Sequence, residues 1–266
     1  TNDTSAIYKM GASMAQQCRR LGIHVNFAPC VDVNNNAMNP VINSRSFGSD
    51  PQRVANCATA YAKGMQDNGL MACVKHFPGH GDTKVDSHKD APIINHSLQR
   101  LDSIELYPFN ELFQQGVDAV MVGHLLIPAL DSVQNAIATC SKKISTDLLQ
   151  KQMNFKGLIF TDALEMGGIV KLFPQGELEV RCLIAGCDVL LIPGEFSVVA
   201  MAIKQALLDG RLTIEDIDNK CLKILKMKEK YVLNNSKSID LENIKQDLNL
   251  SYVDALNAQL MQKAVT

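Results

Sequence analysis

Five short apolar segments, separated by stretches with helical patterns, constrain the fold more than any other feature of this sequence. Each segment is rich in β-branched or other apolar residues, as buried strands are, and together they lie at 23–28, 70–75, 118–123, 157–161 and 188–192. The helical patterns between and after them cover 51–68, 98–115, 145–153, 176–185 and 196–209. Near-continuous apolar strands that alternate with helices predict a parallel sheet covered by helices. The alternation fits both a barrel and a doubly wound sheet.

The connections that follow the predicted strands are much longer than those that precede them. Gly, Asn, Asp and His are frequent in the three long connections, at 29–50, 76–97 and 124–144. In barrels and doubly wound sheets alike, the active site lies at the carboxyl ends of the strands. We therefore expect the functional residues in these three loops and at the strand ends before them.

Composition limits the classes of partner. The chain has 266 residues, 46% of them hydrophobic and 20% charged, which suits one globular domain with a sizeable core. A net charge of −2 and a pI near 6.3 give no field that would gather nucleic acid or an anionic membrane. No segment reaches the roughly 18 consecutive apolar residues of a membrane-spanning helix. We expect neither nucleic acid nor a membrane as a partner.

The eight cysteines contain no C-x-x-C pair, and several stand in apolar segments such as MACVKH and AGCDVLLIP. Free cysteine behaves as a small apolar residue, so we expect buried free thiols. Free thiols favour a reducing compartment and hence the cytoplasm, with a periplasmic or secreted protein as the alternative.

The loop KHFPGHGDTKVDSH at 75–88 holds three of the six histidines and has three interpretations. A metal site could use His76, His80, Asp82, Asp86 and His88, although no fixed ligand pattern such as H-E-x-x-H supports it. A structural loop could satisfy its own backbone with these polar groups. Alternatively, His88 is a general acid–base catalyst oriented by Asp86, because residues one apart in an extended turn can face the same side and form a hydrogen bond.

A second candidate, Asp162, follows the apolar segment 157–161, where the core needs no carboxylate. A helix N-cap is the alternative role, but a position at the carboxyl edge of a barrel favours catalysis. Candidates for binding substrate are Arg45, Lys75, His76 and His124. A surface arginine and a satisfied loop histidine remain alternatives for Arg45 and His124, and we interpret Asp32 as holding its own loop together.

Six segments, in this order, resemble glycoside hydrolase family three: NFAPCVDVN, NPVINSRSFGSDP, KHFPGHGDTKVDSHKDAP, VGHLLIPALD, GLIFTDALEMGGI and AGCDVLLIP. The resemblance covers roughly residues 5 to 210 and is strongest to the bacterial NagZ-type β-N-acetylglucosaminidases. It implies a (β/α)8 TIM-type barrel. It also implies that Asp162 is the nucleophile, that Asp86 and His88 supply the acid/base, and that Arg45, Lys75 and His76 bind sugar hydroxyls, without a metal or cofactor.

The resemblance implies a retaining hydrolase that removes β-linked N-acetylglucosamine from non-reducing ends, as in peptidoglycan fragments, through a covalent glycosyl-Asp162 intermediate. The alternatives are a broad β-glucosidase of the same superfamily and an inactive sugar-binding fragment. A histidine acid/base places no second anion beside the nucleophile, so phosphorolysis is a side possibility.

Five predicted strands stand where a barrel of this type has eight, and an Asp-x-Glu-Gly-Gly segment of the family is absent. We therefore expect residues 1–232 to be a barrel domain lacking its N-terminal strands. Residues 233–266 are expected to form a helical and polar segment that leads toward a second domain of a longer protein.

Overall fold

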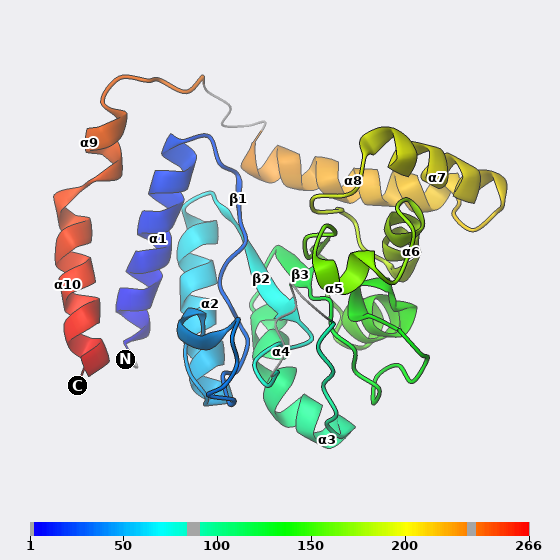
Figure 1. The fold of residues 1–266 in the computed structure, drawn as a ribbon. Helices are drawn as coiled ribbons and strands as arrows, with labels where there is room; N and C mark the ends of the chain where they lie inside the picture. The colour runs from blue at the N-terminus through cyan, green and yellow to red at the C-terminus, as the bar shows by residue number, and fades with distance from the viewer. Residues whose placement is uncertain (1–2, 84–90, 233–237, 266) are drawn as a thin grey trace.

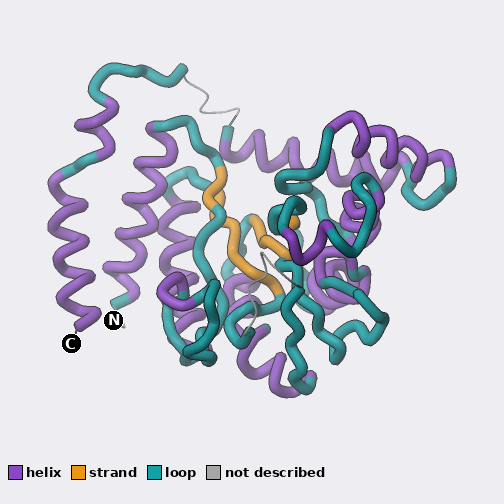
Figure 2. The backbone as a smooth tube through the Cα atoms, viewed as in Figure 1, coloured by secondary structure: helices purple, strands orange, loops and turns teal. Residues whose placement is uncertain are grey.

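Four parallel strands form the centre of the molecule in a computed structural model that describes residues 3–83, 91–232 and 238–265 (Figure 1). They are β1 (Val25–Asn26), β2 (Met71–Phe77), β3 (Ala119–Val122) and β4 (Leu158–Thr161), and they lie in the order β1-β2-β3-β4. Figure 2 shows them as the orange segments between helices. A doubly wound sheet reverses its strand order, whereas this order follows the chain throughout. The fold is therefore that of a (β/α) barrel of TIM type.

The predicted fifth strand at 188–192 is wrong as a strand, because only one bridge, between Phe160 and Val189, joins it to β4. The N–H of Thr161 donates to the carbonyl of Val189 at 3.0 Å, so the parallel pairing continues locally. Pairing stops where Ile192 adopts a φ of 45° and Pro193, which has no N–H, follows. The described residues thus hold four strands and one bridged segment of the barrel.

All five predicted helical stretches are helical in the structure. The predicted helices at 51–68, 176–185 and 196–209 are confirmed as α2 (Pro51–Asp67), α6 (Glu177–Ala185) and α7 (Phe196–Leu208). The stretch 98–115 is divided into α3 (Leu98–Arg100), the π-helical η2 (Leu101–Glu105) and α4 (Tyr107–Gln114). The break falls at Leu106, and Pro108, which lacks an N–H, stands in the first turn of α4, where no N–H partner is needed. The helix predicted at 145–153 is the π-helical η4 (Lys143–Gln152).

Other helices were not predicted individually. They are α1 (Thr4–Arg20), η1 (Asn43–Arg45), η3 (Ala138–Cys140), α5 (Gly167–Val170), α8 (Ile214–Tyr231), α9 (Ile244–Leu248) and α10 (Ser251–Val265). Helix α10 runs beside α1, and Lys263 pairs with Asp3 there (Figure 1). In the part of the chain that the structure describes, no helix is long and apolar enough to cross a membrane.

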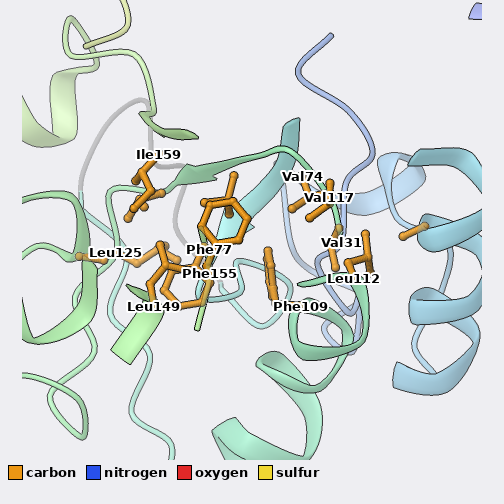
Figure 3. Close-up of a cluster of buried hydrophobic side chains, with 14 of the residues drawn as sticks. Val31, Val74, Phe77, Phe109, Leu112, Val117, Leu125, Leu149, Phe155 and Ile159 are labelled. Carbon is orange, nitrogen blue, oxygen red and sulfur yellow. The ribbon is translucent and has the colours of Figure 1, made fainter. Parts of the chain in front are cut away.

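Both faces of the sheet are apolar, and alternate residues of each strand serve different layers. Val74, Val122 and Ile159 face the outer layer, whose core includes Phe77, Phe109 and Phe155 (Figure 3). The intervening residues form a second cluster on the opposite, inner face, namely Met71, Cys73, Ala119, Met121, Leu158 and Phe160. This alternation follows from the two-residue period of a strand. The inner cluster is the interior of the barrel.

Helix α8 closes the amino end of this interior. Tyr231 is buried in the inner cluster and pairs with Asp118, just before β3, while Lys223 pairs with Asp188 at the start of the bridged segment. Figure 1 shows α8 across the top of the sheet, whereas the loops that follow the strands lie at the other end, near α3. The amino end is therefore packed, which leaves the carboxyl end to carry a site.

Helices α1 and α2 cross at two glycines. A Cβ on Gly11 would overlap the carbonyl oxygen of Tyr61, and one on Gly64 would overlap the carbonyl oxygen of Tyr8. Neither neighbour is the end of a flexible side chain, because both are helix backbone. The crossing thus requires glycine at both positions.

We predict that Gly64→Ala lowers the free energy of unfolding by about 2 kcal/mol, because overpacking outweighs the better helix propensity of alanine. Gly210→Ala is the control: a Cβ there meets nothing within 4 Å, and only its φ of 69° is unfavourable. That variant should lose about 1 kcal/mol. Urea unfolding measures both, and a Gly64→Ala protein as stable as the wild type would contradict the close crossing.

Candidate active site

Asp162 stands at the carboxyl end of β4 on the inner face of the barrel. It follows Leu158 and Phe160 in the two-residue period, and its N–H donates to the carbonyl of Val122 at 2.9 Å. Its Oδ1 accepts from the N–H of Ala163, also at 2.9 Å. The next helix, α5, begins only at Gly167 with Met166 as its N-cap. Asp162 is therefore not the cap of a helix in this structure.

Surrounding groups favour the carboxylate form of Asp162. Burial acts to raise the pKa of this carboxyl, but the imidazoles of His76 and His124, the N–H of Ala163 and the ammonium of Lys75 outweigh burial, and the pKa lies below its usual range. Asp162 is thus ionised at neutral pH, as a nucleophilic carboxylate must be.

Lys75 lies near enough to Asp162 for their charges to interact, because both residues stand on the inner face at the carboxyl ends of their strands. Lys75 follows Met71 and Cys73 on the inner face and is half-buried. Burial, and to a lesser extent the guanidinium of Arg45, lowers the pKa of the Lys75 ammonium, while Asp162 acts in the opposite direction. The structure therefore brings the predicted residues Lys75 and Asp162 to one end of the barrel interior.

His76, the next residue, is 4% exposed and is held by a fully buried carboxylate, Asp32. Its ring Nδ1 lies 2.8 Å from Asp32 Oδ2, and its backbone N–H lies 3.2 Å from both carboxylate oxygens. Asp32 also accepts from the N–H of His80 at 2.6 Å and from the thiol of Cys30 at 3.0 Å. Asp32 thus joins the loop after β1 to the end of β2.

Arg45, the last residue of η1, lies next to this group. Its side chain is exposed, and Nη2 lies 3.4 Å from Nε2 of His76, while Nη1 donates to the carbonyl of Val41 at 3.4 Å. Arg45 therefore lies beside His76, and the predicted residues Arg45, Lys75, His76 and Asp162 lie in one neighbourhood.

His124 is placed differently. It is 1% exposed, and both ring nitrogens have protein partners: Nε2 lies 3.0 Å from the carbonyl of Ala163, and Nδ1 lies 2.6 Å from Oγ1 of Thr139. This arrangement favours the satisfied loop histidine of the two sequence interpretations. Because it holds the residue after Asp162, His124 supports the orientation of that carboxylate. Its contact with sugar stays a prediction.

Asp86 and His88 lie outside the described residues, but the chain on both sides of them is described. Asp82 Oδ2 lies 2.9 Å from Nε2 of His96 and 3.5 Å from Nη2 of Arg100. Thr83 Oγ1 lies 2.9 Å from Nδ1 of the buried His80. The loop that carries the predicted dyad therefore starts beside the Asp32 and His76 group.

Two clusters within the described residues bring metal-binding atom types together, and neither is the predicted set. In the cluster of Cys30, Asp32 and His76, the carboxylate already accepts several N–H groups. In the cluster of Asp82, His96 and Glu105, the guanidinium of Arg100 already supplies a cation, 3.1 Å from Oε1 of Glu105. Hydrogen bonds and ion pairs thus engage the carboxylates of Asp32 and Asp82 and one oxygen of Glu105.

Asp32 holds more than its own loop, which is all that was expected of it, and Asn39 is a site residue that was not predicted. The Asn39 amide donates to the carbonyls of His80 and Gly81 at 2.8 and 3.0 Å, and a Cβ on Gly81 would overlap the carbonyl of Val33. The loop after β1 and the loop after β2 thus interlock. The available signals were Asp32 and Asn39 in one long loop and the Gly-rich PGHG turn in the other.

We predict that Asp32 makes the free energy of unfolding depend on pH in the acid range. Burial acts to raise its pKa, but the imidazoles of His76 and His80 and the Cys30 hydrogen bond lower the pKa below its usual range. A lowered native pKa gives stability that is fully present above the unfolded value of about 3.9 and is lost as the pH falls through the native pKa. The free energy of unfolding, from urea titrations between about pH 2 and 7, should therefore fall less steeply in acid for Asp32→Asn. Parallel curves would contradict this role.

Comparison with known proteins identifies the family. The model of the glycosyl hydrolase family 3 N-terminal domain matches residues 1–227. Beta-hexosaminidase A of Pseudoalteromonas piscicida is 35% identical over 241 residues, which are 84% of this chain and 40% of that protein.

Solved structures agree with this result. A family 3 β-N-acetylglucosaminidase from Paenibacillus sp. is 36% identical with a TM-score of 0.86, over 93% of this chain and 49% of that one. The β-glucoside phosphorylase BglX is 26% identical with a TM-score of 0.89, over 96% and 47%. The chain thus spans less than half the length of each of these relatives. Since the family model covers most of its residues, the chain belongs to glycosyl hydrolase family 3, in the part that forms the family's N-terminal domain.

Proposed function

We propose that this chain carries the catalytic site of a retaining β-N-acetylhexosaminidase that removes N-acetylglucosamine from non-reducing ends. The observation that carries the proposal is Asp162, an ionised carboxylate at the mouth of the barrel interior with Lys75, His76 and Arg45 nearby. Relatives named as β-hexosaminidase and β-N-acetylglucosaminidase support the substrate class. Peptidoglycan fragments are the proposed natural substrate, on the resemblance to NagZ-type enzymes.

In the proposed reaction, Asp162 attacks the anomeric carbon as the bond to the leaving oxygen breaks, which gives a covalent glycosyl-enzyme. Water then attacks the same carbon and releases Asp162. The hydrogen bond from Ala163 occupies Oδ1, which leaves Oδ2 as the attacking oxygen. Two successive displacements at one carbon retain its configuration.

We propose that Arg45, Lys75 and His76 hold the sugar. A sugar hydroxyl both donates and accepts a hydrogen bond, so it is recognised best where donors and acceptors stand together. Arg45 and Lys75 supply N–H donors, and His76, beside Arg45, supplies a ring nitrogen. Their position near Asp162 would fix the glycosyl ring over the nucleophile.

For proton transfer we propose His88, with Asp86 to orient its ring, on the strength of the sequence resemblance. Thr83, the last described residue before this loop, contacts His80 in the interlocked turn. Histidine has an unperturbed pKa near 6.5, so it can protonate the leaving oxygen and later accept a proton from water near neutral pH. Most retaining glycosidases use a second carboxylate for this purpose.

The other candidate functions differ from this proposal in the substrate or acceptor that is used, or in the absence of any reaction. A broad β-glucosidase would hydrolyse aryl glucosides at least as well as aryl N-acetylglucosaminides, and an inactive fragment would bind the sugar without turnover. Phosphorolysis, the activity named for the similar BglX structure, would require inorganic phosphate as acceptor. A panel of aryl glycosides, with and without phosphate, separates all of these.

We also propose that residues 1–232 are the barrel domain and that 233–266 lead toward a further domain, because the relatives are longer. A cytoplasmic location is supported by the eight cysteines, which are all free thiols, five of them buried.

We expect Asp162→Ala to lower kcat by at least about 1000-fold while N-acetylglucosamine binding changes only a few-fold, because a nucleophile acts in the chemical step. Asp188→Asn is a matched control, since Asp188 is a buried carboxylate at the opposite end of the sheet, paired with Lys223. Steady-state rates and calorimetric binding measure the two effects. An Asp162→Ala protein that keeps a tenth of the wild-type rate would exclude Asp162 as nucleophile.

Removal of His88 should slow glycosides with poor leaving groups far more than activated aryl glycosides, because only the former need a proton. Azide should rescue deglycosylation in His88→Ala, since it attacks without a base. Asp86→Ala should show the same pattern more mildly. The measurement is a series of leaving groups with and without azide, and an equal loss across the series without rescue would assign the acid/base elsewhere.

A further inference from the structure

We propose that Asp32 is a positioning residue that fixes the proton of His76 on Nδ1, so that Nε2 faces the site as a hydrogen-bond acceptor. The consequence for recognition, which rests on the proposed function, is that His76 selects a sugar hydroxyl that donates a hydrogen. A group that only accepts would be bound less well at that position.

The proton follows from the partners of the two ring nitrogens. A carboxylate oxygen of Asp32 lies 2.8 Å from Nδ1, and an ionised carboxylate can only accept, so Nδ1 must carry a hydrogen. Nε2 lies 3.4 Å from Nη2 of Arg45, and a guanidinium nitrogen can only donate. Both contacts are satisfied by one tautomer, with Nδ1 protonated and Nε2 carrying its lone pair.

Several contacts fix the orientation of the Asp32 carboxylate. Two backbone N–H groups, of His76 and His80, donate to it, and backbone donors cannot change their protonation. Asp32 is fully buried, and the turn that it holds is interlocked with its own loop through Asn39 and Gly81. The carboxylate cannot rotate away from Nδ1 without leaving these buried N–H groups unpaired, which is costly.

Nε2 of His76 lies beside one donor, Arg45, and Lys75 is the preceding residue in the chain. When a sugar binds, Arg45 would give up its long 3.4 Å contact with Nε2 and donate, as Lys75 can, to the oxygen of a hydroxyl whose hydrogen then points to Nε2 of His76. This arrangement matches a hydroxyl, which needs both partners, and not a fluorine, which offers no hydrogen. Asp32 touches no substrate in this account and acts only through His76.

Asp32→Asn separates this role from a structural one. One oxygen becomes an NH2 group, and it must avoid the N–H of His80, which lies 2.6 Å from Oδ1. The NH2 group therefore takes the place of Oδ2 and faces Nδ1 of His76 and the sulfur of Cys30. The imidazole, unlike a backbone N–H, can respond by moving its proton to Nε2, so this variant should invert the tautomer without changing the shape of the site.

The first test is the tautomer itself, read from two-bond 1H–15N correlations of the full chain labelled with 15N-histidine. The His76 signals are assigned from their loss in His76→Gln. The wild type should show protonated Nδ1 and Asp32→Asn protonated Nε2, with Asp188→Asn like the wild type. A wild-type His76 protonated on Nε2 overturns the proposal, as does an Asp32→Asn protein that keeps the proton on Nδ1. If Asp32→Asn does not fold, the proposal is tested by which ring nitrogen of His76 carries the proton in the wild-type spectrum.

The second test uses methyl β-N-acetylglucosaminide and its 3-, 4- and 6-deoxyfluoro derivatives, with binding measured by calorimetry. For the hydroxyl that meets His76, the wild type should bind the fluoro derivative about tenfold more weakly, because fluorine donates no hydrogen bond to Nε2. Asp32→Asn should lose this preference, and Asp188→Asn should keep it. Equal binding of all derivatives by the wild type refutes the selection of a donor. If the wild type does not bind the parent glycoside, the proposed function fails, and the tautomer measurement alone decides the role of Asp32.

Discussion

Both faces of the parallel sheet are apolar and must be covered. The placement of the helices and of the candidate site follows from how the two faces are covered. Alternate strand residues supply an outer layer under the helices and an inner cluster in the barrel interior. Helix α8 closes the amino end of that interior with Tyr231, whereas the carboxyl end remains for polar residues. The same two-residue period that places Cys73 and Phe160 inside continues to Lys75 and Asp162, so the packing of the core positions the candidate nucleophile and one candidate sugar-binding residue.

The polar end of the interior is organised by a buried carboxylate. Asp32 accepts hydrogen bonds from two backbone N–H groups, one imidazole and one thiol, which lie on the loop after β1, at the end of β2 or in the turn that follows β2. A fully buried charge is stable only when it is paired and hydrogen-bonded, and Asp32 meets both conditions. The orientation of His76 therefore depends on a residue that need not touch a substrate.

Local sequence signals predicted the framework well. Asp50 and Pro51 mark the start of α2, and the apolar segments at 70–75, 118–123 and 157–161 became β2, β3 and β4. The sequence could not decide where pairing stops at Ile192, because that depends on backbone conformation and not on apolarity. It also could not reveal the crossing of α1 on α2, since Gly11 and Gly64 are distant in sequence and each is an unremarkable helix residue by itself.

The candidate site was predictable where strand periodicity or the family resemblance applied, as for Lys75, His76 and Asp162. Asp32 was underestimated because its importance arises from contacts with residues more than forty positions away. His124 could not be decided from sequence, because only the structure shows that Thr139 and Ala163 occupy both ring nitrogens.

The central claim, that Asp162 forms a covalent bond to the sugar, is tested most directly by trapping the intermediate. A fluorinated N-acetylglucosaminide with a good leaving group slows deglycosylation more than glycosylation, so the glycosyl-enzyme accumulates. Peptide mass spectrometry should then find the mass of one fluorinated sugar on the peptide that contains Asp162 and none in Asp162→Ala. Turnover of the reagent without an adduct, or an adduct on another residue, would contradict the account.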